Sequence, residues 1–562
     1  MSSVLPVLSA RLSTAATEAF GLTLDPELRP ATKPEFGHFQ TNLALRLAKP
    51  LGLAPPAIAA TLVEHLVVDD LCVPPTIAGP GFVNLELRTD VLAAAVNSPA
   101  AFAPRGERVV VDYSQPNVAK QMHVGHLRST VIGDALCNVL AYVGYEVIRQ
   151  NHVGDWGTQF GMLVEQLLDE DPAQSLDLES LQGLYQRSRA HFDSSSEFAD
   201  RSRARVVALQ SGDAGTRALW QRMVDVSLVE FERLYARLGT GLTPADVVGE
   251  SAYNDELPDV VDDLTAAGLL TESGGALCAF LPGFTGRDGS PLPVIVRKSD
   301  GGFGYSATDL AAVRHRVREL EAQRIIYVVD QRQALHFRQI FALAAAAGWL
   351  PSTTIAEHVG FGTVLGPDGK PFKTRSGDTV RLATLLDQAV ERATALLDER
   401  GAPIDSRASI AQAVGIGAVK YADLSSDRVN DYVFALDRMV AMTGNTGPYL
   451  QYAHARLTRL LAKADAGPTL VTVLENPVEQ RLALQLDAFA STVEQVAETL
   501  QPHRLCGYLF ELATTLSAFY ELCPVLTSEG ETRASRLALC AATRRVLGDG
   551  LGLLGITAPD SM

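Results

Sequence analysis

The sequence predicts a multidomain α/β protein. We expect a Rossmann-like parallel-sheet domain with an insertion, a small α+β domain before it and an all-α bundle after it. Two strand-like segments, 108–114 and 146–151, flank a segment of helical periodicity at 124–143, which is the βαβ pattern of a parallel sheet. Residues before 104 mix helical segments with short alternating strands, and residues after about 410 show helical spacing only. A chain of 562 residues is long enough for about three or four domains.

Residues 1–103 are expected to form the small α+β domain. Near the start, Leu5, Leu8 and Leu12 repeat at helical spacing, which indicates a folded surface helix rather than a secretory signal peptide. The alternating segment 82–87 predicts a half-buried strand. A turn-rich stretch at 97–106 ends the domain.

The sheet domain is expected at 104–440. Three successive valines, Val109 to Val111, predict a buried strand, and Gln115-Pro116-Asn117 breaks it. A polar helical region begins at about 163, after which strand-like segments return. These segments lie at 293–297, 324–329 and 358–365, and a helix is expected at 335–347. We therefore expect one sheet interrupted by an insertion at about 163–290.

The last domain, 441–562, is expected to be a helical bundle. Apolar residues step by four and three along two successive segments, which is the spacing of packed helices. The first segment carries Leu482, Leu486, Phe489, Val493, Val496 and Leu500, and the second carries Leu505, Leu509, Leu512, Leu516 and Phe519.

The formal net charge of −17 argues against a protein that coats nucleic acid through its overall field. Two local clusters of cations remain, and each is either a solvated helix face or an RNA contact. They are Arg456, Arg459 and Lys463, and Arg533, Arg536, Arg544 and Arg545.

The cysteines indicate a reducing compartment, and we expect a cytoplasmic protein. The six cysteines form no Cys-x-x-Cys pair and lie beside no histidine cluster, which predicts buried free thiols rather than disulfides or structural zinc. The densest apolar run, 340–350, is too short to cross a bilayer, so no membrane association is expected.

A short motif, His123-Val124-Gly125-His126, opens the predicted helix after the first strand of the sheet domain. The two imidazoles fall three residues apart in the first helical turn, where unpaired N–H groups and the helix dipole attract phosphate. Gly125 leaves no side chain to block a flat base or ribose. The motif predicts phosphate or nucleotide contact, and the alternative is a pair of ordinary hydrogen-bonded histidines at a helix start.

A glycine- and proline-rich loop at 366–378 forms the second chemical element. It carries Lys370, Lys373 and Arg375, which can reach phosphates while backbone N–H groups help to hold them. Taken alone, the loop could equally be an exposed hairpin turn. A nucleotide site at the carboxyl end of the same sheet favours the phosphate-binding interpretation, because loops after different parallel strands converge there.

Several longer runs resemble arginyl-tRNA synthetases of bacterial type. They are VDYSQPNVAKQMHVGHLRST at 111–130, NHVGDWGTQFG at 151–161, KTRSG at 373–377 and GNTGPYLQYAHAR at 444–456. The resemblance runs from the first domain to the end of the bundle. It implies a class I aminoacyl-tRNA synthetase that joins L-arginine to AMP with ATP and then transfers the arginyl group to its tRNA.

The resemblance also implies how ATP is handled. Attack on the α-phosphate spreads negative charge over the phosphoryl oxygens, so positioned donors dominate such catalysis. His123 and His126 would meet that charge, with Lys370 and Lys373 on the outer phosphates. In the second motif of the class a threonine stands here where a lysine is usual, which leaves open whether Lys370, Lys373 or Arg375 supplies the charge. We expect Lys370 and Lys373 together.

An arginine pocket needs acceptors for a planar guanidinium that stays charged and carries five donors. The resemblance points to Asp112, Asn117, Tyr305, Asp309 and Gln333. We expect Tyr305 and Asp309, four residues apart, to contact the guanidinium. Asn117 and Gln333 are expected at the amino and carboxylate end of the substrate, and Asp112 at either end.

Contacts with tRNA(Arg) are expected in the first and last domains. The segment 37–42 is similar to a family segment that contacts the tRNA elbow, so Phe39 would stack on a base while Gln40 and Asn42 read its edge. The alternative is a plain loop-to-helix turn. In the last domain Tyr449 and Arg456 are expected to contribute to anticodon binding. Mg²⁺ is expected to arrive with ATP, no protein metal ligand is predicted, and we expect a monomer.

Two other functions remain open from the motifs alone. Another class I synthetase, or a small nucleotidyltransferase, would share the His-x-Gly-His turn, although the small enzymes lack the first domain and the long bundle. A synthetase-derived binding protein would keep the fold without catalysis. Retention of His123, His126, Asp309 and Lys373 argues against the latter.

Overall fold

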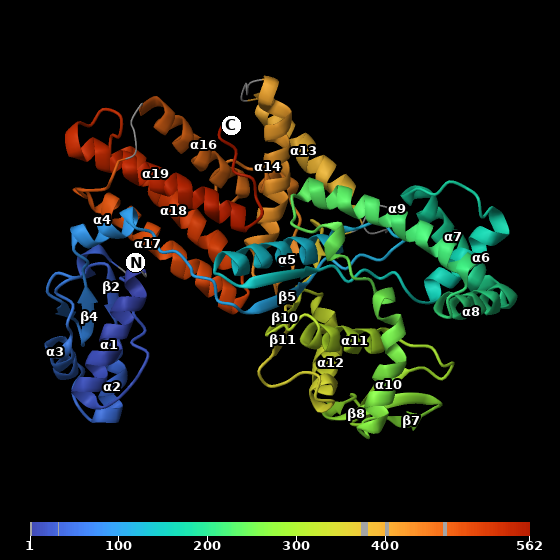
Figure 1. The fold of residues 1–562 in the computed structure, drawn as a ribbon. Helices are drawn as coiled ribbons and strands as arrows, with labels where there is room; N and C mark the ends of the chain where they lie inside the picture. The colour runs from blue at the N-terminus through green and yellow to red at the C-terminus, as the bar shows by residue number, and fades with distance from the viewer. Residues whose placement is uncertain (1–2, 32, 373–379, 400–403, 465–468) are drawn as a thin grey trace.

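The computed structural model describes residues 3–31, 33–372, 380–399, 404–464 and 469–562. It contains a small α+β domain, a parallel sheet covered by helices on both faces, and an all-α bundle (Figure 1). In Figure 1 the sheet lies near the centre, with the N-terminal domain and the last helices of the bundle on the left and the helices of 158–238 on the right. The predicted fold class is confirmed.

The central sheet has four parallel strands in the order β11-β10-β5-β6. Their bounds are β5 Arg108–Asp112, β6 Glu146–Gln150, β10 Arg324–Tyr327 and β11 Ile355–His358. In the register, Tyr327 pairs with both Asp112 and His358, and Asp112 pairs with Gln150. The four carboxyl ends therefore lie level at one edge of the sheet.

Strand β5 is buried on both faces, as its valine run predicts. Val109 and Val111 belong to the same apolar cluster as α5 (Val124–Tyr142), and this cluster continues into the N-terminal domain and the C-terminal bundle. Val110 belongs instead to the apolar cluster of α11 (Tyr305–Arg318) and α12 (Ala334–Ala346). The two faces of the sheet thus belong to two separate cores.

One predicted strand lies outside this sheet. Residues 293–297 belong to β9 (Pro291–Arg297), which pairs antiparallel with β8 (Ala276–Thr285), and β8 pairs with β7 (Thr271–Ser273). The expectation that 293–297 joins the parallel sheet is wrong, because β9 alternates between buried and exposed residues as a half-exposed antiparallel strand does. The end of the segment 358–365 also leaves the sheet, since β12 (Val364–Leu365) pairs with β13 (Tyr432–Val433).

The chain after β6 forms a group of helices around its own apolar cluster. The helices are α6 Thr158–Glu170, α7 Leu178–Ser194, α8 Ser196–Gln210 and α9 Ala214–Leu238. The chain then returns to the sheet, because the Asn151 backbone bonds to the backbone of Asp246 and Val248 at 2.8 and 3.1 Å. The following short helices are η2 Pro244–Asp246, η3 Glu250–Glu256 and α10 Leu257–Ala266.

The N-terminal domain combines a four-stranded antiparallel sheet, in the order β1-β2-β4-β3, with helices. The strands are β1 Arg29–Pro30, β2 Phe39–Thr41, β3 Thr76–Ala78 and β4 Phe82–Leu85, and the helices are α1 Val4–Phe20, η1 Pro34–Phe36, α2 Leu43–Leu51, α3 Pro55–His65 and α4 Thr89–Asn97. The domain is tied to the C-terminal bundle at the start of α1. Asp487 Oδ2 accepts hydrogen bonds from the Val4 backbone N–H and the Ser3 hydroxyl, both at 2.9 Å.

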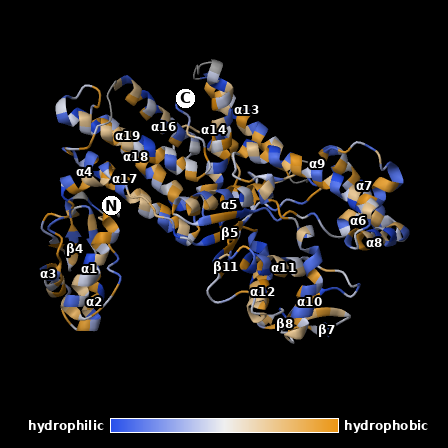
Figure 2. Ribbon diagram, in the orientation of Figure 1, coloured by the Kyte–Doolittle hydropathy of each residue, from blue (hydrophilic) through white to orange (hydrophobic). Residues whose placement is uncertain are grey.

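The bundle follows the sheet in the chain, and its helices alternate orange and blue along their length in Figure 2, as amphipathic helices do. Their bounds are α13 Leu382–Glu399, α14 Ile404–Leu424, α15 Leu436–Met439, α16 Gly447–Ala464, α17 Pro477–Thr499, α18 His503–Leu522 and α19 Gly530–Leu553. All six cysteines are buried and unpaired, which confirms the prediction of buried free thiols. None of the helices in the described part of the chain has the length and apolar character needed to span a membrane.

Candidate functional site

Loops from all four parallel strands meet at the carboxyl edge of the sheet. Asn117 and His123 follow β5, Asp155 follows β6, His336 follows β10, and the segment 360–372 follows β11. This edge is where open parallel sheets bind their ligands. Asn117, His123 and Gln333, which the sequence analysis assigned to ATP or arginine, therefore come from loops and helix starts at this edge.

His123 and His126 cap the N-terminus of α5. The His123 Nδ1 accepts a hydrogen bond from the Gly125 N–H, and the His126 Nδ1 accepts one from the His123 N–H, each at 3.0 Å. Because both Nδ1 atoms accept, each neutral ring carries its proton on Nε2. The ring centroids lie 3.9 Å apart. The turn thus keeps two Nε2–H donors for a ligand at the positive end of the helix dipole.

Burial keeps both imidazoles uncharged. Desolvation lowers the pKa of His126 to about 3, helped by the nearby charges of His123 and Lys120. The pKa of His123 is also lowered, first by burial and then by Lys120. Lys120, whose ammonium lies 4.6 Å from the centroid of the Tyr185 ring, is a cation of this site that was missed in the sequence. Its position in an irregular loop gave no periodic signal.

Gly125 makes room within the turn itself. A Cβ at this position would lie 2.8 Å from His123 Cε1, which is closer than real Cβ contacts come. The glycine therefore allows the His123 ring to fold over the start of α5, in addition to leaving the turn open.

The His123–His126 turn lies beside residues 380–382, which directly follow the basic loop in the chain. The Val124 N–H donates to the Val380 carbonyl at 3.0 Å, and the Leu382 N–H donates to the Met122 carbonyl at 2.9 Å. At its start the basic loop forms an exposed hairpin turn closed by a bond from Gly366 N–H to the Lys370 carbonyl at 2.7 Å. This hairpin was the alternative interpretation, and Lys370 is exposed on it.

The other two basic residues predicted in this loop, Lys373 and Arg375, lie outside the described residues.

Tyr305 and Asp309 lie at the N-terminal end of α11, and both contact His336 of α12. The Asp309 Oδ2 lies 2.6 Å from His336 Nε2, and the Tyr305 ring meets the His336 ring edge-on with centroids 4.9 Å apart. Tyr305 is 66% exposed, whereas Asp309 and His336 are half-buried. The structure thus brings the two predicted guanidinium ligands together and adds a histidine that was not predicted.

Glu250 is a second missed residue of this pocket. The pKa of its carboxyl group is raised to about 8, first by burial and then by the negative charges of Asp309 and Asp155. Asp155 accepts from the Ser251 backbone N–H at 2.9 Å and from the Ser251 hydroxyl, and burial raises its pKa as well. Three carboxyl groups therefore share one partly desolvated region, which suits a cationic ligand. Glu250 falls inside the range assigned to the insertion, so no sequence signal linked it to the site.

Asp112 is already engaged by the protein. Its Oδ2 lies 2.7 Å from Nη2 of the fully buried Arg316, and its Oδ1 accepts from the Gln115 side chain at 2.7 Å. Arg316 belongs to α11, the helix that carries Asp309. Both carboxylate oxygens therefore bind side chains of this protein, and the expectation of a direct contact with arginine does not fit this arrangement.

Asn117 and Gln333 present exposed amides with no side-chain hydrogen bond to the described residues. Asn117 forms an isolated bridge with Gly154, whose missing side chain leaves room for it, because a Cβ there would lie 2.5 Å from Asn117 Oδ1. Gln333 ends η4 (Gln331–Gln333), directly before α12. Both amides are free to bind a polar substrate.

The residues predicted to contact the tRNA elbow have structural partners in the N-terminal domain. Phe39 is only 4% exposed and lies in the apolar core, so the predicted stacking on a base is wrong for this conformation. The Gln40 side chain donates to Asn84 Oδ1 at 2.7 Å, and Asn42 precedes α2 with a buried, unpaired Oδ1. The alternating burial of β2 explains the error, because Phe39 points to the covered face of the sheet.

The two predicted anticodon residues behave differently from each other. Tyr449 is half-buried, and its hydroxyl lies 3.2 Å from Ser517 Oγ within the bundle. Arg456 is exposed, and its guanidinium carbon lies 4.1 Å from the centroid of the Tyr520 ring. Tyr452, one turn before Arg456, is 39% exposed and was not predicted. Together Tyr452, Arg456 and Tyr520 give a cationic aromatic surface of the kind on which bases stack.

Within the described ranges, His, Cys, Asp and Glu side chains form no group of three or more that could hold a metal ion.

Three families match the chain one after another. Residues 7–87 match "Arginyl tRNA synthetase N terminal domain", residues 89–436 match "tRNA synthetases class I (R), catalytic domain", and residues 450–562 match "DALR anticodon binding domain". The catalytic-domain match alone covers more than half of the chain.

Whole-chain relatives agree with the domain matches. An arginine–tRNA ligase from Cutibacterium acnes is 53% identical over 585 aligned positions, which cover 100% of both chains. The crystal structure of the arginyl-tRNA synthetase from Plasmodium falciparum is 29% identical, with a TM-score of 0.86 and full coverage of both chains. The Thermus thermophilus arginyl-tRNA synthetase is 27% identical, with a TM-score of 0.83 over 99% of this chain and 100% of that one.

Proposed function

The chain belongs to the class I arginyl-tRNA synthetases, and from this membership we infer that it ligates L-arginine to its tRNA with ATP, through an arginyl-adenylate. The observation that carries this inference is full-length identity of 53% to an arginine–tRNA ligase. The alternatives of another class I synthetase, a small nucleotidyltransferase or a noncatalytic derivative have no comparable support.

For ATP, we propose that the two Nε2–H donors of His123 and His126 bind the phosphoryl oxygens that gain charge as the arginine carboxylate attacks the α-phosphate. Uncharged imidazoles suit this role, because they donate hydrogen bonds to the phosphoryl oxygens without forming a fixed ion pair with the nucleotide. Lys370 and Lys373 are proposed on the outer phosphates, with Arg375 as a further contact. Lys120, which lies close enough to influence both histidines, is a fourth candidate for the charge usually supplied by the second loop lysine.

For arginine, Asp309 and Tyr305 are proposed to bind the guanidinium together with Glu250. The carboxyl groups supply acceptors in a partly desolvated place, and charge-assisted bonds there are stronger than in water. Asn117 and Gln333 are proposed for the amino and carboxylate end of arginine, because their amides are exposed and unpaired. Asp112 is proposed as a positioning residue that holds α11 through Arg316.

For tRNA, we propose a division of labour along the chain, with 1–103 contacting tRNA, 104–440 catalysing both steps and 441–562 binding the anticodon. Arg456, Tyr449, Tyr452 and Tyr520 are the proposed anticodon surface. Gln40 and Asn42 remain proposed contacts in the first domain. Mg²⁺ is proposed to enter with ATP, and the enzyme is proposed to act as a cytoplasmic monomer.

The test is arginylation of total tRNA by the purified chain, followed by pyrophosphate exchange with each amino acid in the presence of tRNA. We expect arginine to support both reactions. Faster exchange with any other amino acid would contradict the assignment of Asp309 and Glu250 to a guanidinium.

A further inference from the structure

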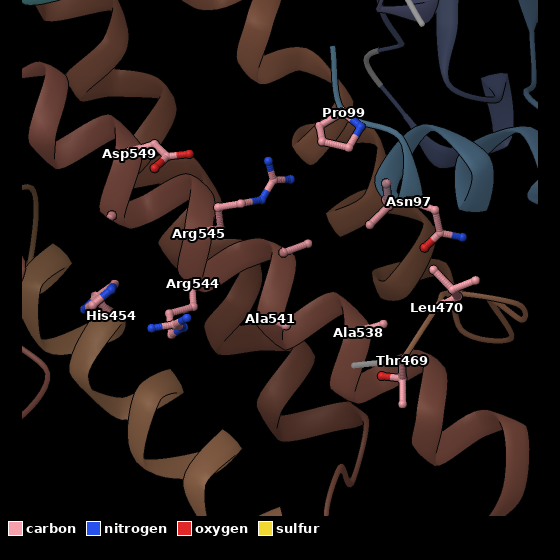
Figure 3. Close-up of a pocket in the computed structure, with 13 residues that line it drawn as sticks. Asn97, Pro99, His454, Thr469, Leu470, Ala538, Ala541, Arg544, Arg545 and Asp549 are labelled. Carbon is pink, nitrogen blue, oxygen red and sulfur yellow. The ribbon is translucent and has the colours of Figure 1, made fainter. Parts of the chain in front are cut away.

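A cavity of about 630 Å³ lies at the junction of the N-terminal domain and the C-terminal bundle, and none of the proposed site residues lines it (Figure 3). Its walls come from the end of α4 and the segment after it, from His454 of α16, from Thr469 and Leu470, and from one face of α19. In Figure 3 the Arg545 side chain points from α19 toward Pro99, and the Arg544 side chain points toward His454.

The two arginines of this junction cavity have no carboxylate partner among the described residues. Neither guanidinium lies within 4 Å of an Asp or Glu oxygen there, and the Nε of Arg544 is buried without a hydrogen-bond acceptor. Two other arginines of the same helix are used by the fold. Arg533 donates to the Ala464 carbonyl at 3.1 Å, and Arg536 pairs with Glu479 at 2.7 Å. Arg544 and Arg545 are therefore available to an external anion.

The cavity carries a surplus of positive charge in a chain whose formal net charge is −17. Among the described residues that line it, Asp549 is the single acidic one, and the pKa of that carboxyl is raised, because burial outweighs the opposing effect of Arg545. Two guanidinium groups against one carboxyl group favour a ligand with phosphate groups, which arginine binds with planar, paired hydrogen bonds.

His454 offers an acceptor in the same cavity. Its Nδ1 lies 3.1 Å from the Pro559 carbonyl oxygen, which can only accept, so Nδ1 carries the proton. The Nε2 of the neutral ring is then a hydrogen-bond acceptor. Gly548 lies across from it, where a Cβ would come within 3.4 Å of Nε2. The site therefore combines donors for phosphate with an acceptor for a hydroxyl group.

RNA backbone supplies both groups in alternation, phosphate and ribose 2′-hydroxyl. A base-reading role is not supported, because both polar atoms of the Asn97 amide already bond to the Val471 backbone at 2.8 and 2.9 Å. Ala538 and Ala541 on the α19 face are small, so they leave the backbone of a ligand free to approach the helix.

We propose that the junction cavity binds the sugar–phosphate backbone of tRNA independently of its sequence, with Arg544 and Arg545 on phosphates and His454 Nε2 accepting from a 2′-hydroxyl. This site is separate from the proposed anticodon surface, and it rests on the proposed function only in taking tRNA as the RNA that this protein meets.

The test measures the dissociation constant of tRNA(Arg) at several salt concentrations for the wild type, Arg544→Gln and Arg545→Gln. Each variant is expected to bind about three- to tenfold more weakly and to reduce the salt slope by about 1, as the loss of one phosphate contact does. The turnover rate at saturating tRNA stays unchanged. Arg481→Gln, an exposed arginine of α17 outside the cavity, is the matched control and should behave as the wild type does.

Three further measurements identify the kind of ligand that the cavity binds. Arg544→Lys keeps the charge and should recover most of the affinity. A DNA copy of the tRNA should bind more weakly than the RNA to the wild type. Inorganic phosphate and ATP should bind wild type and both glutamine variants equally, and a loss there with unchanged tRNA binding would overturn the proposal in favour of a free-phosphate site.

Wild-type affinity and salt slope in both glutamine variants would likewise overturn the RNA site while leaving the proposed function intact. Failure of the wild type to arginylate tRNA would instead count against the proposed function, since the binding measurements need no catalysis.

Discussion

Burial holds two residues of the site, His126 and Glu250, uncharged at neutral pH. His126 has its pKa lowered to about 3, so it is a neutral donor at neutral pH. Glu250 has its pKa raised to about 8, so in the empty pocket its carboxyl is mostly protonated at pH 7. A guanidinium arriving beside Glu250 would favour the charged form and release that proton.

Arginine binding should therefore depend on pH through Glu250. Because the raised pKa keeps the acid protonated below about pH 8, the KM for arginine should increase as the pH falls from about 8.5 to about 6.5. The measurement is pyrophosphate exchange at saturating tRNA and ATP. Glu250→Gln should raise the KM by about tenfold or more and flatten this pH dependence. An unchanged pH profile in the variant would remove Glu250 from the pocket.

The His123–His126 turn has two roles that two substitutions can separate. His126→Ala removes both the Nε2–H donor and the acceptor for the His123 N–H, whereas His126→Asn keeps a side-chain acceptor near that N–H. We expect both to lower the arginylation rate at least about tenfold, with tRNA affinity nearly unchanged, because the donor acts on the developing charge. If only the alanine variant were slow, the turn would matter as a helix cap and not as a phosphate contact.

At the scale of secondary-structure elements, α11 sets the geometry of the arginine pocket. Its first turn carries Tyr305 and its second Asp309, and its last turn carries Arg316, which reaches down to Asp112 at the end of β5. Arg316 also lies with its guanidinium carbon 4.8 Å from the centroid of the Tyr327 ring, at the end of β10. One buried cation thus fixes the helix against two neighbouring strands.

Removing one partner of that buried pair should destabilise the fold. Asp112→Asn leaves Arg316 charged in a fully buried site without its carboxylate partner, which costs about 3–5 kcal/mol and lowers the melting temperature. The double variant Asp112→Asn with Arg316→Met should recover much of this loss. Asp90→Ala, which breaks an exposed ion pair with Arg88, is the control and should change stability by less than about 1 kcal/mol. Thermal unfolding followed by circular dichroism measures all three.

Local patterns predicted the elements that build the nucleotide side of the site, and distant contacts decided the rest. The valine run, the turn and the helix start at 124 are local features, so β5 and α5 follow from the sequence. The sequence did not predict which distant segments pack against one another. Strand 293–297 pairs with β8 rather than with the sheet, and Phe39 is covered by its own domain. Glu250 and His336 join the pocket only because the chain returns to the sheet after long excursions.

At the scale of the whole molecule, the N-terminal domain is held by polar contacts that reach into the bundle. Asp487 of α17 caps α1, and Asn97 at the end of α4 bonds both ways with the Val471 backbone. Burial raises the pKa of Asp487, and the bonds from Val4 and Ser3 oppose that shift. The domain is thus fixed at two points on one side of the bundle.

Asp487→Ala should loosen this attachment without touching the reaction site. We expect faster limited proteolysis in the segment 98–106 and weaker tRNA binding, with pyrophosphate exchange at saturating tRNA unchanged. Glu498→Ala, an exposed carboxylate on the same helix, is the control. Equal proteolysis rates in the two variants would show that the cap does not hold the domain.

The apolar cluster on the α5 face of the sheet runs without a break through the N-terminal domain and the C-terminal bundle, whereas the face toward α11 and α12 has a core of its own. The three family matches divide the sequence into three domains, but these domains share one apolar core. A fragment of residues 89–436 would expose the apolar side chains on the α5 face of the sheet that the other two domains cover, and we expect it to aggregate on expression. Replacement of one domain by the corresponding domain of a relative would succeed only if the new domain matched the old one in shape where it packs against the shared core.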